Sequence, residues 1–200
     1  MNESPAADRP GLRERKKAKT RALIQEHALR LFNEQGYTET TVEQIAEAAE
    51  VSPSTFFRYF GTKEDVVIYD ALDPVLIEAW RNQPPELGPL PSMRAAMKET
   101  FGQLNAEQLA ETMVRGRLVY SVPELRLAML DDMVRTTGLM ASEVALRTGR
   151  SVDDFEVRVF CGAMIGALLA SMLPALEGSA SDLMGLLDES FDFLEKGLPL

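Results

Sequence analysis

Residues 51–65, VSPSTFFRYFGTKED, hold hydroxyl, aromatic and cationic side chains within fifteen residues. Short hydroxyl groups that can donate to and accept from the edges of nucleic-acid bases come first, at Ser52, Ser54 and Thr55. Side chains that can reach phosphate oxygens follow, at Arg58, Tyr59 and Lys63. Phosphate contacts position a protein on a duplex, whereas base contacts read the sequence. The spacing therefore predicts a binding surface that combines both kinds of contact.

A helix must begin in this stretch to present those side chains. Ser52 is a favoured N-cap residue, and Pro53 suits the first helical position. The free amides and the dipole at a helix N-terminus favour an anion, so the first turn can serve phosphate as well as bases. Phe56 and Phe60 lie one turn apart and are expected to pack inward. Phe57 is then left to contact a thymine methyl group.

A second short helix is expected just before this one. Thr41 and Gln44 form a capping-box pattern, and the apolar offsets that follow give one narrow apolar face. Two short helices separated by three or four residues are typical of a helix-turn-helix. A longer helix from about residue 11 or 13 to residue 35 precedes both. Gly36 follows it, and glycine commonly ends a helix by adopting a left-handed backbone conformation.

The formal net charge of −10 conceals an uneven distribution of charge. Residues 1–63 hold ten basic and nine acidic side chains, whereas residues 64–200 hold eleven basic and twenty-two acidic ones. Seven basic residues lie between Arg9 and Arg21, beside a single acidic residue, Glu14. Like charge repels phosphate, so we expect the first part to face a nucleic acid and the acidic remainder to serve another partner.

Residues 19–69 resemble the DNA-binding domain of the TetR (tetracycline-repressor) family of transcriptional regulators. The resemblance is carried by the order and spacing of Thr20, Arg21, Ala28, Leu31, Phe32, Gly36, Thr41, Val42, Ile45, Ala46, Ala49, Val51, Ser52, Thr55, Arg58, Tyr59, Phe60, Lys63 and Glu64. Two positions depart from the family pattern. Glu50 stands where the family often has glycine, so a turn that favours positive φ would carry a side chain at a cost of about 1 kcal/mol. Phe57 stands where the family often has tyrosine, which removes a phenolic phosphate contact.

The resemblance implies a role for each matching position. In the family, the positions of Tyr59 and Lys63 contact phosphates, the start of the helix reads bases, and Thr41 lies near the DNA backbone. The predicted DNA-binding residues are Arg21, Thr41, Ser52, Pro53, Ser54, Thr55, Phe57, Arg58, Tyr59 and Lys63. One such module binds weakly, so a dimer on a palindromic operator in double-stranded DNA is expected, with half-sites about 34 Å apart.

The rest of the sequence has helical periodicity and no convincing period-two run, which predicts an all-α protein. A helix from residue 62 to about 82, bent at Pro74, is followed by a loop over residues 84–92. Further helices are expected over residues 92–104, 106–121, 123–148, 151–176 and 181–195. We therefore expect a flexible basic arm (1–18), a three-helix helix-turn-helix domain (19–65) and a helical ligand-binding and dimerisation domain (66–200).

Small residues recur every four positions in the uncharged stretch 159–176 and would let helices approach closely. With the apolar face of the last helix they could build a four-helix bundle across a two-fold axis. An ordinary monomer core is the alternative interpretation, but TetR-family proteins commonly dimerise through their last two long helices. The predicted interface residues are Gly162, Gly166, Ala170, Leu183, Leu187 and Phe191.

All nine internal methionines lie after Ser92, and methionine suits an apolar surface that adapts to varied partners. Residues 115–126, RGRLVYSVPELR, are similar to the C-terminal domain of actinobacterial TetR regulators thought to bind acyl-CoA-like ligands. That similarity implies an anionic head group near Arg115, Arg117 or Arg126, although surface ion pairing is the alternative for each. The predicted ligand-binding residues are Trp80, Phe101, Met113, Arg117, Tyr120, Met129, Met133, Phe160 and Met164.

The sequence offers little support for an enzyme, a metal site or a cofactor, and none is predicted. His27, the single histidine, lies in the middle of a helix, and Cys161 lies in an apolar run where a thiol is inert. A single cysteine excludes an internal disulfide and fits a reducing cytoplasm. The uncharged stretch reaches the lower length limit of a membrane span, but its many small residues favour burial in protein.

Together these features predict a cytoplasmic, homodimeric repressor that a small lipophilic effector, such as an acyl-CoA, releases from its operator. Two alternatives stay open at this point. One is a DNA-binding protein that responds to no ligand, and the other is a protein-interaction adaptor that keeps the fold without using it.

Overall fold

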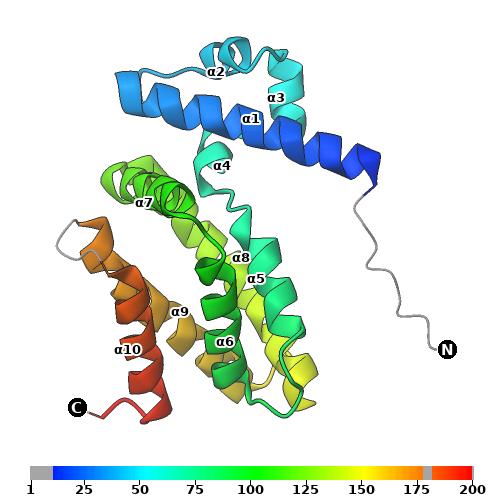
Figure 1. The fold of residues 1–200 in the computed structure, drawn as a ribbon, viewed down its shortest axis with the longest axis vertical. Coiled ribbons are helices and arrows are strands. Elements are labelled where there is room, and N and C mark those ends of the chain that lie inside the picture. Colours follow the sequence, from blue (N-terminus) through cyan, green and yellow to red (C-terminus); the bar gives the residue numbers. More distant parts are fainter. Residues whose placement is uncertain (1–10, 178–181, 200) are drawn as a thin grey trace. The chain divides into compact units, whose positions relative to one another are not determined.

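The computed structural model describes residues 11–177 and 182–199, and every regular element in these ranges is a helix, which confirms the all-α expectation (Figure 1). The chain divides into two compact units, the first ending at Val67 and the second beginning at Ile68.

The first unit contains α1 (Leu12–Gln35), α2 (Val42–Ala48), α3 (Pro53–Tyr59) and nearly all of α4 (Lys63–Ile68). Its core consists of apolar side chains from all four helices and the turns between them: Ile24, Ala28, Phe32, Tyr37, Ile45, Ala46, Ala49, Phe56, Phe60, Val66 and Val67. Gly36 has a φ of 92° and ends α1 as expected. The Gln25 side chain donates to the Val66 carbonyl at 2.9 Å, which fixes α4 on α1.

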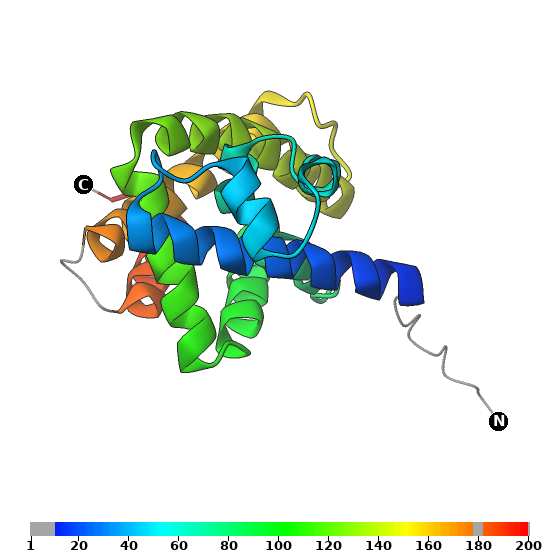
Figure 2. The same cartoon turned by 90° about the horizontal axis from the view of Figure 1, so that it is seen from above.

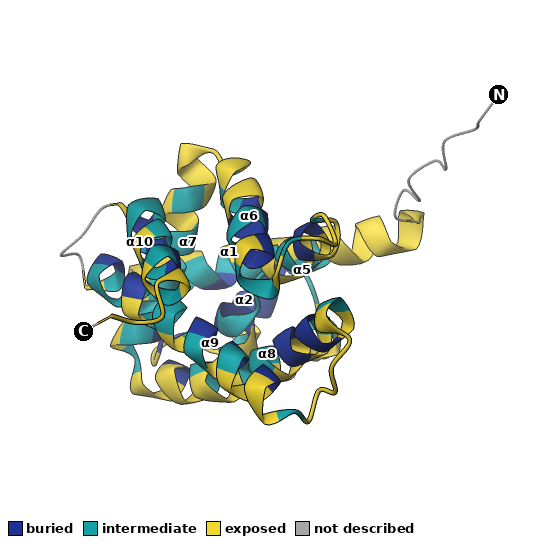
Figure 3. Ribbon diagram, turned by 90° about the horizontal axis from the view of Figure 1, so that it is seen from below, coloured by how far each residue is buried: buried dark blue, intermediate teal, exposed yellow. Residues whose placement is uncertain are grey.

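The described part of the expected basic arm belongs to α1, whose start at Leu12 agrees with the helix expected from about residue 11 or 13. Residues 12–18 form the first turns of α1, which Figures 1 and 2 show projecting beyond α2 and α3. Residues 11–19 are exposed throughout (Figure 3). The Leu, Arg, Lys, Glu and Ala residues of this segment have good intrinsic helix propensity, so the helix continues without a packing partner. The remainder of the arm, residues 1–10, lies outside the described residues.

The second unit contains α5 (Leu72–Arg81), α6 (Pro89–Gly102), α7 (Ala106–Ser121), α8 (Pro123–Thr148), α9 (Phe155–Leu176) and α10 (Leu183–Glu195). α5 packs on α6, while α9 packs against α7, α8 and α10. A single core joins α5, α6, α8, α9 and α10, and it includes Trp80, Met93, Met164 and Phe191. The indole N–H of Trp80 donates to Ser92 Oγ at 2.8 Å, so this buried polar group is paired.

The helix expected over residues 62–82 is interrupted rather than bent. α4 ends at Ile68 and α5 begins at Leu72, with Pro74 in the first turn of α5. A proline ring clashes with the carbonyl four residues earlier, here that of Asp70, so an unbroken helix through this point is disfavoured. Asp70 Oδ1 instead accepts the Leu72 N–H at 2.8 Å and supports the new helix start.

Two other helix starts differ from expectation. α6 begins at Pro89, so the loop predicted over residues 84–92 is shorter, because proline is tolerated in the first helical turn. α9 begins at Phe155 rather than at Ser151, and Asp154 is its N-cap residue. The start predicted for the last helix, Ser181, lies outside the described residues; α10 begins at Leu183, with Asp182 accepting from the Gly185 N–H at 2.8 Å.

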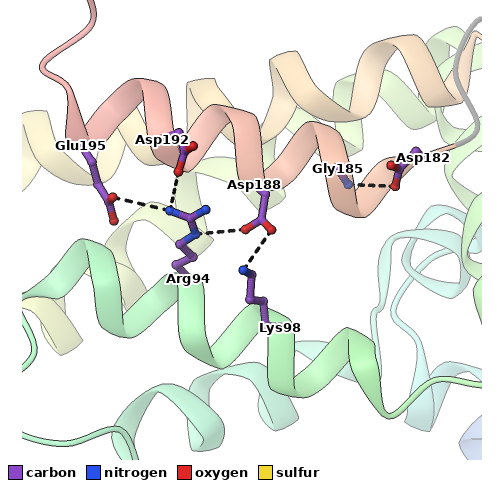
Figure 4. A network of polar contacts seen from close by, with 7 residues as sticks. All are labelled: Arg94, Lys98, Asp182, Gly185, Asp188, Asp192 and Glu195. Carbon is purple, nitrogen blue, oxygen red and sulfur yellow. Dashed lines mark hydrogen bonds and ion pairs between the residues drawn. The ribbon is translucent and has the colours of Figure 1, made fainter.

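A charge network joins α6 to α10 (Figure 4). The Arg94 guanidinium donates to Asp188 at 3.0 Å, to Asp192 at 2.6 Å and to Glu195 at 3.5 Å. The Lys98 ammonium lies 2.9 Å from the second carboxylate oxygen of Asp188. The basic side chains come from α6 and the acidic ones from α10, so opposite charges hold the two helices together.

Among the described residues, α9 is the one helix long and apolar enough to cross a membrane by length and composition. Its inner side chains, among them Val157, Cys161 and Met164, are buried in the core of the second unit. Other positions of α9, among them Gly162, Gly166 and Ala170, are exposed, so burial of the whole stretch in protein stays a prediction. The thiol of Cys161 is buried as well, and desolvation raises its pKa, which keeps it protonated and inert.

Candidate functional site

The turn between α2 and α3 has the geometry that the helix-turn-helix pattern requires. Both hydrogen bonds of the predicted capping box are present, with the Gln44 N–H donating to Thr41 Oγ1 at 3.2 Å and the Thr41 N–H donating to Gln44 Oε1 at 2.9 Å. After α2 the Val51 N–H donates to the Ala46 carbonyl at 2.9 Å. Glu50 has a φ of 53°, so this position does carry a side chain on a left-handed backbone.

The start of α3 exposes a connected group of hydroxyls. Ser52 Oγ accepts the Thr55 N–H at 3.1 Å and lies 2.9 Å from both Ser54 Oγ and Thr55 Oγ1. Arg58 donates to Thr55 Oγ1 at 3.4 Å, one turn further along. Ser52, Pro53 and Ser54 are exposed. The structure thus brings the predicted base-reading hydroxyls and a predicted phosphate-binding cation onto one surface of one helix.

The aromatic side chains of this stretch divide between the core and the surface as expected. Phe56 and Phe60 are buried, with ring centroids 5.9 Å apart. Phe57 is 53% exposed. Its ring lies edge-on to that of Phe56, with the two ring centroids 5.4 Å apart. The inward pair anchors α3, and Phe57 remains available for a partner.

Two predicted phosphate-binding residues are engaged within the unit. Arg21 is partly buried and donates to the Tyr59 carbonyl at 3.2 Å, at the end of α3. Lys63 donates to the carbonyls of Tyr37 and Thr40 at 2.9 Å and 3.1 Å, and its ammonium lies 4.1 Å from the Tyr37 ring centroid. These bonds fix the ends of α1 and α3, and a phosphate contact by either residue remains a prediction.

Tyr37 also links this corner to α4. Its hydroxyl donates to Glu64 Oε1 at 2.6 Å. Desolvation by burial opposes ionisation of Glu64, but the hydrogen bonds from Tyr37, the backbone and Thr62 outweigh it and lower the pKa of this carboxyl. Glu64 is therefore ionised at neutral pH and holds Tyr37 in place beside Lys63.

A basic groove beside α3 contains two predicted DNA-binding residues, and its lining residues from α1 were not among those predicted. It encloses about 750 Å³ and is lined from α1 by Leu12, Arg13, Glu14, Lys16, Lys17 and Thr20, and from α3 by Arg58 and Tyr59. Four cations thus face one groove beside the hydroxyl surface of α3. The signal in the sequence was the spacing of Arg13, Lys16 and Thr20, which places them on one face of a helix.

Most of the predicted ligand-binding residues lie in the core of the second unit or pack against it. Trp80 and Met164 are buried in its core, and Phe101, Met113 and Phe160 are partly buried against it. Met129 and Met133 are partly buried on α8, whereas Arg117 is exposed. The Tyr120 hydroxyl donates to Glu177 at 2.8 Å. Ligand binding by this set of residues stays a prediction.

The arginines considered for an anionic head group are partly engaged. Arg115 is ion-paired with Asp70 and donates to the Tyr69 carbonyl at 2.8 Å. Arg126 donates to the Tyr120 carbonyl at 2.9 Å. Arg115 therefore ties α7 to the segment between α4 and α5.

The predicted dimer-interface residues separate into two groups. Gly162, Gly166 and Ala170 are exposed along α9, and a Cβ atom added at either glycine would meet nothing within 4 Å. Leu183, Leu187 and Phe191 are buried in the chain's own core instead, at 6%, 3% and 3% exposure. Within the chain, α10 packs on α9 and α6, and a contribution of these three residues to a dimer interface stays a prediction.

Comparison with known proteins agrees with this geometry. A family model described as bacterial regulatory proteins of the tetR family matches residues 24–69, and one described as the MftR C-terminal domain matches residues 87–199. The chain is 40% identical over 163 residues to the HTH-type transcriptional regulator TcmR of Streptomyces glaucescens, covering 76% of this chain and 72% of that protein. It is 25% identical over 186 residues to the putative mycofactocin biosynthesis transcriptional regulator MftR of Mycobacterium tuberculosis, covering 92% and 93%.

Solved structures share the fold. The TetR-family repressor FadR of Thermus thermophilus in complex with lauroyl-CoA has a TM-score of 0.59 at 24% identity, covering 90% of this chain and 95% of that one. The fatty acid degradation regulator FadR of Bacillus halodurans also has a TM-score of 0.59, at 22% identity, covering 89% and 99%. The two matching family models and the 40% identity to TcmR show that the chain belongs to the TetR family of transcriptional regulators.

Proposed function

We propose that this TetR-family regulator is a cytoplasmic, homodimeric repressor that binds a palindromic operator and leaves it when a small lipophilic effector binds. The observation that carries the proposal is the exposed, hydroxyl-bearing start of α3 beside the basic groove of α1. Base-edge donors and phosphate-binding cations on adjoining surfaces fit a recognition helix in a major groove.

The effector part of the proposal rests on the second unit. Its core is rich in methionine and aromatic side chains, which suit a flexible apolar ligand. FadR of Thermus thermophilus, which shares the fold, is a repressor in complex with lauroyl-CoA. We therefore place a long-chain acyl group, as the thioester or the free acid, in the second unit.

Selection of bound duplexes from random DNA, followed by affinity measurements against salt concentration, tests the DNA-binding part. Arg58→Ala should weaken binding to every duplex and reduce the slope of log affinity against log salt by about 2 for a dimer, one phosphate per protomer. Arg30→Ala is the matched control, because Arg30 is exposed in the same unit and pairs with Glu34. Equal effects of both substitutions would refute the assignment of Arg58.

Lauroyl-CoA, lauric acid and coenzyme A, added separately, test the effector part. The two acyl compounds should raise the melting temperature and weaken operator binding, and coenzyme A alone should do neither. By linkage, operator DNA must weaken effector binding by the same factor. If no acyl compound changes the operator affinity, the protein is a ligand-independent DNA-binding protein or answers to another effector class.

A further inference from the structure

The basic groove sets cations of α1 against the far end of α3. Arg13, Lys16 and Lys17 line it from α1, and Arg58 and Tyr59 line it from α3. Because α3 has seven residues, the groove lies about 10 Å along the helix from the hydroxyls at its start. The three α1 cations are not among the DNA-binding residues predicted from the sequence. The groove is therefore a separate part of the surface, beyond the bases that α3 is proposed to read.

The cations of α1 divide between two faces of the helix. Arg13, Lys16 and Lys17 line the groove, whereas Arg15 and Lys19 lie on the opposite face, since successive residues turn by about 100°. All five residues are exposed. Within the described ranges, none of the three groove cations forms an ion pair. Their charges are available to an anion.

The first turns of α1 are weakly held without such an anion. Gly11 is the N-cap residue and makes no side-chain capping bond. Cations at a helix N-terminus oppose the helix dipole, and like charges three or four residues apart repel, as those of Arg13, Lys16 and Lys17 do. Residues 11–19 are exposed, so packing compensates for neither effect. An anion in the groove would reverse both effects, because it neutralises the cations and suits the positive end of the dipole.

The length of the cation row selects a polyanion. Four cations and one carboxylate, that of Glu14, line the groove, so its net charge is positive. From Arg13 to Thr20 the lining follows α1 for about 10 Å, which is longer than a single phosphate group. Each strand of duplex DNA carries a negative charge about every 3.4 Å along the axis, so several phosphates can face the row at once.

We propose that the first turns of α1 and the end of α3 form a phosphate clamp, an inference that rests on the DNA binding proposed above. Arg13, Lys16 and Lys17 bind the DNA backbone together with Arg58, beside the bases that α3 reads. The bound phosphates stabilise the helix over residues 12–19. The clamp adds affinity for every duplex and adds no sequence preference.

Two paired substitutions on the same helix test the clamp in the full-length protein. Lys16→Gln with Lys17→Gln removes two groove charges, and Arg15→Gln with Lys19→Gln removes two charges from the opposite face. Glutamine keeps the helix propensity of lysine and arginine. The groove pair should reduce the slope of log affinity against log salt by about 3 to 4 for a dimer, and the opposite pair by less than half as much. The ratio of operator to random-duplex affinity should stay unchanged in both variants.

The outcomes separate the clamp from the proposed function. Equal reductions from the two pairs, or no reduction from the groove pair, would overturn the clamp while Arg58→Ala still weakens binding. A parent protein that selects no duplex from random DNA would refute the proposed function and the clamp together. Single-stranded RNA that binds as tightly as the operator would overturn the assignment of the groove to a DNA backbone.

Hydrogen exchange tests the effect on the helix. The backbone amides of residues 16–19 should exchange at least tenfold more slowly in the parent protein when operator DNA is bound, whereas those of residues 28–32, in the buried part of α1, should change little. In the Lys16→Gln, Lys17→Gln variant, saturated with the same DNA, the protection of residues 18–19 should be mostly lost. Exchange at residues 16–19 that DNA does not alter would show that phosphates do not stabilise this helix start.

Discussion

At the scale of single residues, Glu50 combines a left-handed backbone, φ 53°, with a side chain next to α3. Glu50→Gly should raise the free energy of unfolding by about 1 kcal/mol, since glycine adopts positive φ without steric cost. Glu50→Ala keeps the strain and removes the charge, so it should leave stability nearly unchanged. Both variants should bind operator DNA more tightly because a carboxylate beside the DNA-facing turn is lost. Denaturant unfolding and DNA titration of the two variants check this, and an equal gain in stability from both would exclude the backbone explanation.

Asp73, in the first turn of α5, gives stability a dependence on pH. Desolvation by burial raises the pKa of Asp73 to about 6 from its ordinary 3.8, and the neighbouring carboxylates of Asp70 and Asp132 add to the rise. The folded state therefore holds this proton more tightly than the unfolded state, and stability falls as pH rises from about 4 to about 6.

Asp73→Asn should remove that fall. Below about pH 4 the variant and the parent should be equally stable, because the carboxyl is then neutral in both the folded and the unfolded state. Above about pH 6 the variant should be more stable. The residue as a whole keeps substantial contact with solvent, so screening should hold the gain to about 1 kcal/mol. Thermal unfolding of both proteins between pH 3.5 and 7 measures the difference; a constant difference across this range would contradict it.

At the scale of elements, the Arg94 network makes the contact between α6 and α10 sensitive to salt. Arg94→Met keeps the aliphatic stem and should lower the free energy of unfolding by about 1 kcal/mol at low salt and by less at 1 M salt. Arg30→Met, which removes one exposed pair within α1, is the control and should cost about half as much or less. Urea unfolding at both salt concentrations distinguishes them, and a salt-independent loss would indicate packing instead.

The same network should respond to acid. The hydrogen bond from Lys98, and then that from Arg94, lowers the pKa of Asp188. Because the folded-state pKa lies below the ordinary value, the stabilisation is present above that value and is lost as pH falls through the folded-state pKa. The difference in stability between Arg94→Met and the parent should accordingly shrink in acid.

At the scale of the whole molecule, the exposed glycines of α9 offer a test of dimerisation. Gly166 lies in open space in the isolated chain, so Gly166→Arg should fold normally while blocking close approach of a second copy. Sedimentation should then show a monomer, and operator affinity should fall by two orders of magnitude or more because one half-site contributes little. Gly102→Arg, at another helical glycine with open surroundings, should remain dimeric and bind DNA. A dimeric Gly166→Arg protein would place the interface elsewhere.

Local chemistry in the sequence was sufficient for the helix caps and the inward aromatic side chains of the first unit. The capping pair Thr41 and Gln44, the N-cap Ser52 and the inward aromatics Phe56 and Phe60 all behave as their types and spacing predict. Each depends on neighbours within a few residues, so the relevant interactions are encoded side by side. The same holds for the positive φ at Glu50, which a tight turn between two short helices imposes.

Partners distant in the chain could not be found in this way. The break between α4 and α5 involves Asp70 and Arg115, which are 45 residues apart, and the basic groove joins α1 to α3. The sequence alone determined that the chain is helical and carries a DNA-binding motif, because periodicity and capping are local properties. Only the tertiary structure showed that Leu183, Leu187 and Phe191 are buried in the chain's own core. An apolar helix face must be buried, but its pattern does not specify against what.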